Sequence, residues 1–359
     1  AAQTLAAQLS AKVMDTDAII ADPSIDAVIV GTPTTTHYDI IHAAAAAGKA
    51  IFCEKPIDLS VARIRDCLAA VAAANVPFMT AFNRRFDPNF AYLQRQIADQ
   101  VIGNVELVTI LSRDPAPPPI GYIKTSGGIF RDMMIHDLDM ARFLLGEEPV
   151  ALTAAASCLV DPAIGAAGDF DTAVVTLKTA SGKLCQISNS RRATYGYDQR
   201  IEVHGSAGML RADNMLETTV EIANAEVMRK SPTQPFFLER YAAAYRAERA
   251  HFVDALVSGA PVTPTGADGL RAQMLADAAD AAEEARMAVV EAAAEGDDAL
   301  MEKYFEDDNL SDEDIVRGLR LAMQQGLCVP VLYAAPQPGI GVVPVLNAMT
   351  RLFPAPDQA

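Results

Sequence analysis

Residues 26–82 alternate short apolar runs with helical patterns, and no other feature of the sequence constrains the fold as strongly. The runs DAVIV (26–30), AIFCE (50–54) and PFMTAF (77–82) have the length and apolar character of buried strands. Helical patterns lie between them, one stopped by Gly48 and the other extending from Ser60 to Asn75. Strands that alternate with helices of this length are typical of a parallel sheet of right-handed βαβ units. The sequence therefore predicts an α/β domain of the Rossmann type over residues 1–100.

A dinucleotide-binding domain of this type begins with a strand, a G-x-G-x-x-G turn and a helix. The 359 residues contain no such turn, and they open with a helical pattern. We therefore expect a truncated dinucleotide-binding domain. The stretch PGIGVVP (338–344) follows a predicted strand, but Pro344 stands where the third glycine would be, which favours a simple turn over a phosphate site.

Residues 101–285 change to longer alternating or β-rich runs with two helical patterns, at 130–146 and 237–258. We expect an α+β domain here, with a largely antiparallel open sheet and the substrate site. Residues 290–359 are αβα in pattern around the predicted strand CVPVLY (328–333), and the boundary before them lies between 275 and 292. The predicted strands of the second region are VELVTILSR, ALTAAASCLV, TAVVTLKT, KLCQISNSRR, RIEVHGS and TTVEIANAEV.

Composition argues against several classes of protein. A net charge of −17 opposes a sequence-independent grip on nucleic-acid phosphates. The sequence has no apolar run long enough to span a membrane and no signal-peptide pattern at its start, so we expect a cytoplasmic protein. The five cysteines and five histidines are dispersed, without the clustered spacing of a metal site or a disulfide framework.

Two short patterns could carry chemistry. Asp132 and His136 are four residues apart in a helical pattern, so their side chains share one face, where a carboxylate would orient the imidazole as a general base. Taken alone, a surface or core histidine is the commoner explanation of such a pair. Lys55 follows a strand end, where its ammonium could stabilise an alkoxide or simply extend along a sheet edge into solvent. Alcohol oxidation also needs a hydride acceptor, which no side chain provides.

The order of several segments resembles the glucose-fructose oxidoreductase and inositol dehydrogenase (Gfo/Idh/MocA) family. DAVIVGTPTTTHYDIIHAAAAAGKAIFCEKP (26–56) is similar to the second half of the family's dinucleotide domain, in which a strand, a T-P-x-x-x-H turn, a helix and E-K-P follow in order. AFNRRFDPNF, LSRDPAPPP, SGGIFRDMMIHDLDMARFLLG and TYGYDQRIEVHGSAGML continue the resemblance over about residues 1–280. Within the family, these segments look most like the bacterial inositol 2-dehydrogenases.

The resemblance implies an NAD-dependent oxidation of a secondary hydroxyl on a cyclic polyol, foremost myo-inositol to scyllo-inosose, with NADP not excluded. It implies that Lys55 reaches the substrate hydroxyl through a cis peptide bond to Pro56, and that Asp132 and His136 form the proton relay. It also implies a homo-oligomer, usually a tetramer. The cofactor side would include Thr32, Pro33, His37, Glu54 and Lys55, and the polyol contacts would be Arg84, Asp114, Tyr197 and Tyr245.

The tail from about residue 290 to 359 is similar to a different family, a fragment of bacterial elongation factor G, through the order of its DALMEKYFE helix, P-V-L, G-V and closing helix. The GTP-site motifs of that family, G-x-x-x-x-G-K-[ST] and Asn-Lys-x-Asp, do not occur in the sequence. Three hypotheses follow: an NAD-dependent polyol dehydrogenase, a truncated fusion product whose dehydrogenase site is inherited but idle, and a translation-associated binding module.

Overall fold

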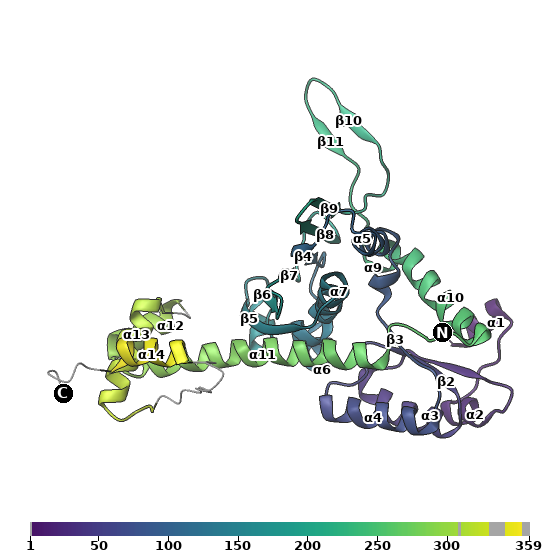
Figure 1. Cartoon of the computed structure of the whole chain (residues 1–359), viewed down its shortest axis with the longest axis horizontal. Coiled ribbons are helices and arrows are strands. Elements are labelled where there is room, and N and C mark those ends of the chain that lie inside the picture. The colour runs from purple at the N-terminus through teal and green to yellow at the C-terminus, as the bar shows by residue number, and fades with distance from the viewer. Residues whose placement is uncertain (1, 308–309, 330–341, 354–359) are drawn as a thin grey trace. The chain divides into compact units, whose positions relative to one another are not determined.

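The computed structural model describes residues 2–307, 310–329 and 342–353, and the chain divides into two compact units, Ala1–Asp280 and Ala281–Ala359 (Figure 1). The first unit contains a three-stranded parallel sheet, a six-stranded mixed sheet and a two-stranded hairpin. The second unit consists of helices where it is described. A Rossmann-like parallel sheet followed by a mainly antiparallel sheet confirms the predicted fold class.

The parallel sheet has the order β1 (Ala27–Val30), β2 (Ala50–Glu54) and β3 (Phe78–Ala81). Helices α3 (His37–Ala46) and α4 (Val61–Ala74) connect these strands, as the alternating pattern predicts. Asn75 ends α4 in the left-handed conformation with φ of 52°, which a short polar side chain tolerates. Two short helices precede the sheet, α1 (Ala2–Leu9) and α2 (Thr16–Ala21).

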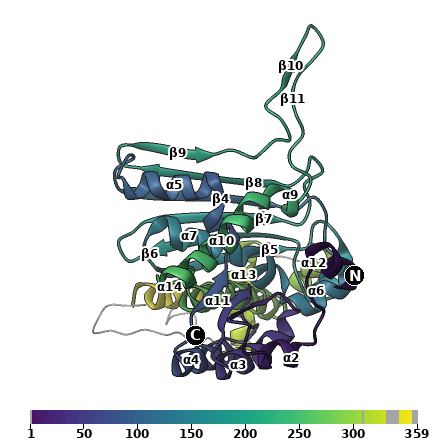
Figure 2. The ribbon, with the colours of Figure 1, turned by 90° about the vertical axis from the view of Figure 1, so that its right-hand side faces the viewer.

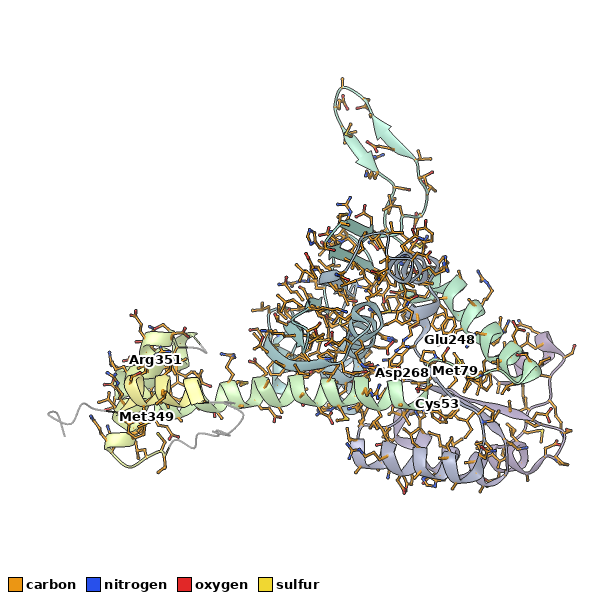
Figure 3. The ribbon with its side chains drawn as sticks, in the orientation of Figure 1. Cys53, Met79, Glu248, Asp268, Met349 and Arg351 are labelled. Atoms are coloured by element: carbon orange, nitrogen blue, oxygen red, sulfur yellow. The ribbon has the colours of Figure 1, made fainter. Side chains whose placement is uncertain are left out.

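The two faces of this sheet are buried by different partners. Ile51 and Cys53 belong to the apolar cluster that the sheet shares with α3 and α4. Phe52 and Met79 point the other way and pack with Phe252 of α10 (Ala242–Ser258); Figure 3 labels Cys53 and Met79 on this sheet. Because both faces of β2 and β3 are covered, these strands have continuous apolar sequences rather than alternating ones, whereas Ile29 of β1 is 61% exposed.

The mixed sheet has the strand order β5-β6-β7-β4-β8-β9, in which only the β4–β7 pair is parallel. Its inner face packs on α7 (Ile135–Leu145) and α5 (Pro88–Ala98) in one large core cluster. The outer face is partly open, because β6 alternates buried Ala173 and Val175 with Val174, which is 39% exposed. The strands are β4 (Val105–Arg113), β5 (Pro149–Ser157), β6 (Thr172–Thr179), β7 (Leu184–Ser190), β8 (Asp198–Gly205) and β9 (Gly208–Ala212).

Three details differ from the sequence predictions. The run 218–227 forms only β10 (Glu221–Ala223), which pairs with β11 (Met228–Lys230) in a hairpin that extends away from the mixed sheet in both views (Figures 1 and 2). The alternation of polar and apolar residues in 218–227 is typical of a strand. It does not determine whether that strand packs against another part of the molecule. Strand β9 lacked a clear pattern of its own and was not predicted.

The third difference concerns the helix predicted over 130–146. The chain first forms a π-helix, Ile129–Met134, and only then α7. Gly127 and Gly128 precede it with φ of 91° and 81°, values that favour glycine. A Cβ on Gly128 would also lie 2.7 Å from an oxygen of Asp169. The wider turn changes the direction of the side chains it carries, and Asp132 is one of them.

The second unit contains the end of α11 (Gly266–Ala294) together with α12 (Asp298–Asp307), α13 (Asp312–Gln324) and α14 (Val342–Leu352). Val290, Ala293, Ala294, Leu300 and Leu310 form its core. The predicted strand 328–333 and the stretch 338–344 lie wholly or largely outside the described residues, so their predictions are not tested. Helices α9 (Phe237–Arg240), α6 (Ile120–Ser126) and α8 (Pro162–Ala166) and the short 3₁₀ helix η1 (Thr34–Thr36) also belong to the first unit. No helix within the described ranges has the length and apolar character needed to cross a membrane.

Candidate active site

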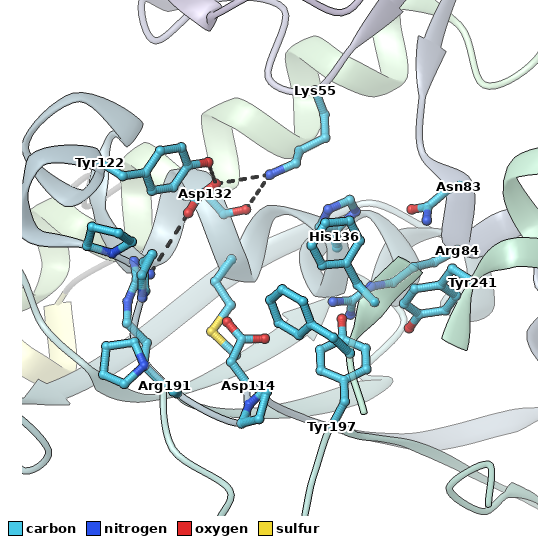
Figure 4. Close-up of a pocket in the computed structure, with 18 of the residues that line it drawn as sticks. Lys55, Asn83, Arg84, Asp114, Tyr122, Asp132, His136, Arg191, Tyr197 and Tyr241 are labelled. Atoms are coloured by element: carbon cyan, nitrogen blue, oxygen red, sulfur yellow. Dashed lines mark hydrogen bonds and ion pairs between the residues drawn. The ribbon is translucent and has the colours of Figure 1, made fainter. Parts of the chain in front are cut away.

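A cavity of about 740 Å³ lies in the first unit, next to the carboxyl end of β2 and beside the ends of β4, β7 and β8 in the mixed sheet (Figure 4). Seven residues that the sequence singled out line it: Lys55, Arg84, Asp114, Asp132, His136, Tyr197 and Tyr245. They come from positions spread over almost two hundred residues of sequence. The fold therefore gathers the predicted catalytic and polyol-binding residues into one pocket.

Lys55 enters this pocket from the end of β2. Its peptide bond to Pro56 is cis, as the resemblance implies. Its Nζ donates to the backbone oxygen of Asp132 at 2.6 Å and to Asp132 Oδ1 at 3.2 Å. The lysine is therefore not a sheet-edge side chain extended into solvent, because its ammonium is held at the pocket wall with its side chain only 15% exposed.

The Asp132 carboxylate contacts Lys55, Tyr122 and Arg191 instead of the predicted partner, His136. Besides Lys55, it accepts a hydrogen bond from the Tyr122 hydroxyl at 3.0 Å and lies 3.9 Å from Arg191 Nη1. No hydrogen bond joins it to His136 in the described structure. The predicted Asp132–His136 contact is thus wrong, because the π-helix turns the carboxylate toward Lys55 and Tyr122.

His136 lines the pocket without any hydrogen-bond partner among the described residues, and its Nδ1 is buried. Phe82 packs against the ring with its centroid 6.3 Å away in an edge-to-face arrangement. Burial lowers the pKa of His136 well below its ordinary value, and the positive charges of Lys55 and Arg84 lower it further. The imidazole is therefore neutral at physiological pH and able to accept a proton.

Arg84 is held by a buried polar network behind the pocket. It lies on the short helix η2 (Asn83–Phe86), and its Nη1 donates to Ser112 Oγ at 3.0 Å and to the Asp137 carboxylate. Asn189 Nδ2 donates to the other oxygen of Asp137 at 2.9 Å. Because Asp137 is fully buried, its charge depends on these partners. This network was not predicted from the sequence, although Asp137, an acid directly after His136 in an apolar helix, signalled it.

The other pocket residues that sequence reasoning missed are polar or aromatic groups from distant segments. Tyr122 follows the proline-rich stretch 115–119, and Arg191 follows β7. Arg191 is only 1% exposed, and its Nη2 lies 3.3 Å from Asp169 Oδ2. No local motif marks such residues, since only the tertiary fold brings them to the pocket. Asn83 and Tyr241 also line it, together with Met133, Phe236 and Phe237.

The predicted cofactor residues lie at the same edge of the parallel sheet but, apart from Lys55, do not line the cavity. His37 is buried, with Nδ1 3.0 Å from the Pro56 oxygen and Nε2 2.8 Å from the Thr32 oxygen. Its ring thus ties the turn after β1 to the peptide after Lys55. Burial raises the pKa of Glu54, the last residue of β2.

This edge fits the nicotinamide end of a dinucleotide. The ends of β1 and β2 are adjacent, because Val30 pairs with Cys53, and parallel sheets bind ligands at the carboxyl ends of their strands. The turn that contains Thr32 and Pro33 leaves β1 beside the Lys55 segment, and the histidine contacts hold the two together. The sequence does not provide the usual residues for the pyrophosphate, because it has no G-x-G-x-x-G turn. Among the described residues, no three His, Cys, Asp or Glu side chains gather as metal ligands.

Comparison with known proteins places the chain among the oxidoreductases. A family model described as "Oxidoreductase family, NAD-binding Rossmann fold" matches residues 1–82, and one described as "GFO/IDH/MocA C-terminal domain" matches residues 90–211. The fold and these matches define an oxidoreductase with a Rossmann-type domain. The chain belongs to the Gfo/Idh/MocA family.

Individual relatives are similar over most of their length. Inositol 2-dehydrogenase of Rhizobium meliloti (strain 1021) is 56% identical over 279 residues, which cover 78% of this chain and 84% of the relative. Myo-inositol 2-dehydrogenase of Thermotoga maritima is 49% identical over 265 residues, covering 74% of this chain and 79% of the relative. The crystal structure of scyllo-inositol dehydrogenase from Lactobacillus casei with bound NAD(H) and scyllo-inositol matches with a TM-score of 0.74 at 30% identity, over 79% of this chain and 86% of that one.

Proposed function

We propose that the chain is an NAD-dependent dehydrogenase that oxidises a secondary hydroxyl of a cyclic polyol, with myo-inositol to scyllo-inosose as the reaction. The observation that carries this proposal is the presence of the Lys55 ammonium and a neutral, unpartnered His136 on the walls of one pocket (Figure 4). The names of the relatives, inositol 2-dehydrogenase and myo-inositol 2-dehydrogenase, support the substrate. The bound NAD(H) of the L. casei structure supports the cofactor.

In this mechanism His136 is the general base. Because burial and two nearby cations keep the ring neutral, it can take the hydroxyl proton as the alcohol is oxidised. The same cations limit how long the ring stays charged, which favours release of the proton afterwards. Asp132 is not the partner of the ring, so its role is to hold Lys55.

Lys55 is the group that stabilises developing negative charge on the substrate oxygen. Two contacts to Asp132 fix its ammonium, and a fixed donor in a water-poor site stabilises an alkoxide more than a mobile one. Tyr122 donates to the same carboxylate and so limits its movement. The polyol contacts we propose are the pocket residues Arg84, Asp114, Tyr197 and Tyr245.

NAD supplies the hydride acceptor when it is bound. The residues we propose for its nicotinamide side are Thr32, Pro33, His37, Glu54 and Lys55, at the adjacent ends of β1 and β2. His37 acts there through the backbone, since both of its ring nitrogens face carbonyl oxygens.

We also propose a cytoplasmic homotetramer. Its support is the outer face of the mixed sheet, where apolar side chains remain partly exposed on three neighbouring strands. A light-scattering mass four times that of the 38.2 kDa chain would agree with this state, and a monomeric mass would contradict it. The residues are Leu107 of β4, Val174 of β6 and Leu184 of β7, all about two-fifths exposed.

An NADH titration separates the working dehydrogenase from the fusion product with an idle site. The chain contains no tryptophan, so nicotinamide fluorescence can be followed without that background. Saturable binding with a dissociation constant in the micromolar range supports the dehydrogenase, whereas a folded chain that binds no NADH supports the idle site. The translation-associated module rests on the tail alone, and failure to co-sediment with ribosomes would remove it.

A further inference from the structure

Charged groups of the pocket are arranged in pairs, and these pairs show which ligand charges the pocket accepts. Lys55 lies 3.2 Å from an oxygen of Asp132, and Arg191 lies 3.3 Å from an oxygen of Asp169. Arg84 is paired with Asp137. Each cation in or behind the pocket wall thus has its own carboxylate, so these three pairs together contribute no net charge.

Asp114 is a fourth carboxylate without such a partner. It follows β4, and its backbone NH donates to the Ser190 oxygen at 3.0 Å, which fixes the residue at the pocket wall. Its carboxylate makes no hydrogen bond and no ion pair in the described structure. Arg191 and Arg84 act on it only from longer range. Figure 4 shows Asp114 between Arg191 and Tyr197 on the same wall.

Burial raises the pKa of Asp114 to about 6, and the charges of Arg191 and Arg84 oppose that rise. The group is therefore mostly ionised at neutral pH. Since the three ion pairs balance, the pocket then carries one uncompensated negative charge. Asp114 is half-buried in the pocket wall. A partly desolvated carboxylate without a donor is costly, and a ligand that donates to it recovers that cost.

We infer that the pocket takes cyclitols that carry a protonated amine in addition to neutral polyols, and that Asp114 binds the ammonium group. The inference deepens the proposed function, because it concerns the substrate class of the same pocket. An ammonium ligand gives Asp114 a cationic donor, which makes a stronger hydrogen bond than a hydroxyl does. A carboxylate or phosphate on the ligand would instead face the uncompensated charge and be repelled. The pocket therefore discriminates by ligand charge, with Asp114 as the residue that determines it.

The test uses the full 359-residue chain and three probes of similar size: myo-inositol, an amino-deoxy-scyllo-inositol and glucuronate. Calorimetry gives the affinity of each probe for the wild-type chain, for Asp114→Asn and for Asp213→Asn. Asparagine keeps the shape of the Asp114 side chain and removes its charge. Asp213 is the matched control, because it removes the same charge at a position 67% exposed and outside the pocket.

For the wild-type chain, we expect the amino-cyclitol to bind at least as tightly as myo-inositol. We expect glucuronate to bind at least about tenfold more weakly than myo-inositol. In Asp114→Asn, the ratio of amino-cyclitol to myo-inositol affinity falls about tenfold, which corresponds to about 1.4 kcal/mol. Asp213→Asn keeps the wild-type ratio. An unchanged ratio in a folded Asp114→Asn chain, or glucuronate bound as tightly as the amino-cyclitol, overturns the inference. The wild-type ranking needs no variant, so the test holds even when the asparagine variant fails to fold.

Oxidation of myo-inositol with NAD is measured in the same samples, so that the two proposals fail separately. Turnover of myo-inositol without selection by charge overturns the inference about Asp114 alone. Selection by charge without turnover of any cyclitol overturns the proposed dehydrogenase alone.

Discussion

The Arg84–Asp137 pair behind the pocket gives a prediction whose magnitude follows from burial. Asp137 is fully buried, and its two carboxylate oxygens accept hydrogen bonds from Arg84, Ser112 and Asn189. Asp137→Ala leaves the guanidinium, with only 6% of its side chain exposed, without a counter-charge in a place that water reaches poorly. Removing one partner of a buried pair costs about 3–5 kcal/mol, so we expect the free energy of unfolding to fall by that amount.

Near-UV circular dichroism in urea measures this loss in the first unit, because seven of the nine tyrosines precede residue 281. The control is Asp213→Ala, which removes an Asp–Arg pair whose side chains are 67% and 56% exposed and should cost less than about 1 kcal/mol. The double variant Asp137→Leu with Arg84→Met removes both charges and should regain most of the stability. A loss for Asp137→Ala as small as that of the control would refute the argument from burial.

Three further predictions concern single groups. His136 has a pKa well below its ordinary value in the folded chain, so the unfolded chain takes up its proton first, and the stability of the wild type falls as pH drops below about 6.5. In His136→Gln that fall is smaller by up to about 1.4 kcal/mol per pH unit, and urea titrations at several pH values check it. Cys53, Cys67 and Cys185 are buried, with thiol pKa values raised by burial, to about 12 for Cys67. A thiol reagent should therefore label these three only after unfolding, and rapid labelling of the native chain would contradict their burial. Tyr122→Phe removes a donor to the carboxylate that holds Lys55 and should lower the turnover number by about tenfold with less effect on KM, as steady-state kinetics would measure.

Helices and strands are predicted best from the sequence where the local hydrophobic pattern agrees with the burial of the segment in the folded chain. β2 and β3 are apolar throughout because both of their faces are covered, and the boundaries of all three strands of this sheet follow the apolar runs closely. The run 218–227 alternates just as a sheet strand does, yet most of it forms no strand, since alternation does not provide a partner. Pairing partners are properties of the whole fold rather than of the segment.

The pocket residues are likewise predicted from the sequence only where a local motif marks them. Motifs could single out Lys55 because E-K-P is a local pattern, and the cavity does contain it. The partner of Asp132 was mispredicted, because a four-residue spacing assumes an α-helix and the chain forms a π-helix there. Arg191 joins the pocket only through the pairing of β4 with β7, which no single stretch of sequence encodes.

We propose that His136 and Lys55 of this pocket catalyse the oxidation of a polyol by NAD, which accepts the hydride. The most direct measurement is the rate of NADH formation when the purified chain is given NAD and myo-inositol, compared with the rates of His136→Ala and Lys55→Met. We predict saturable turnover by the wild-type chain and a loss of about 10²–10⁴-fold in each variant, the range for removal of a positioned acid–base group. Variants that fold and turn over as fast as the wild type would show that neither side chain takes part in the reaction.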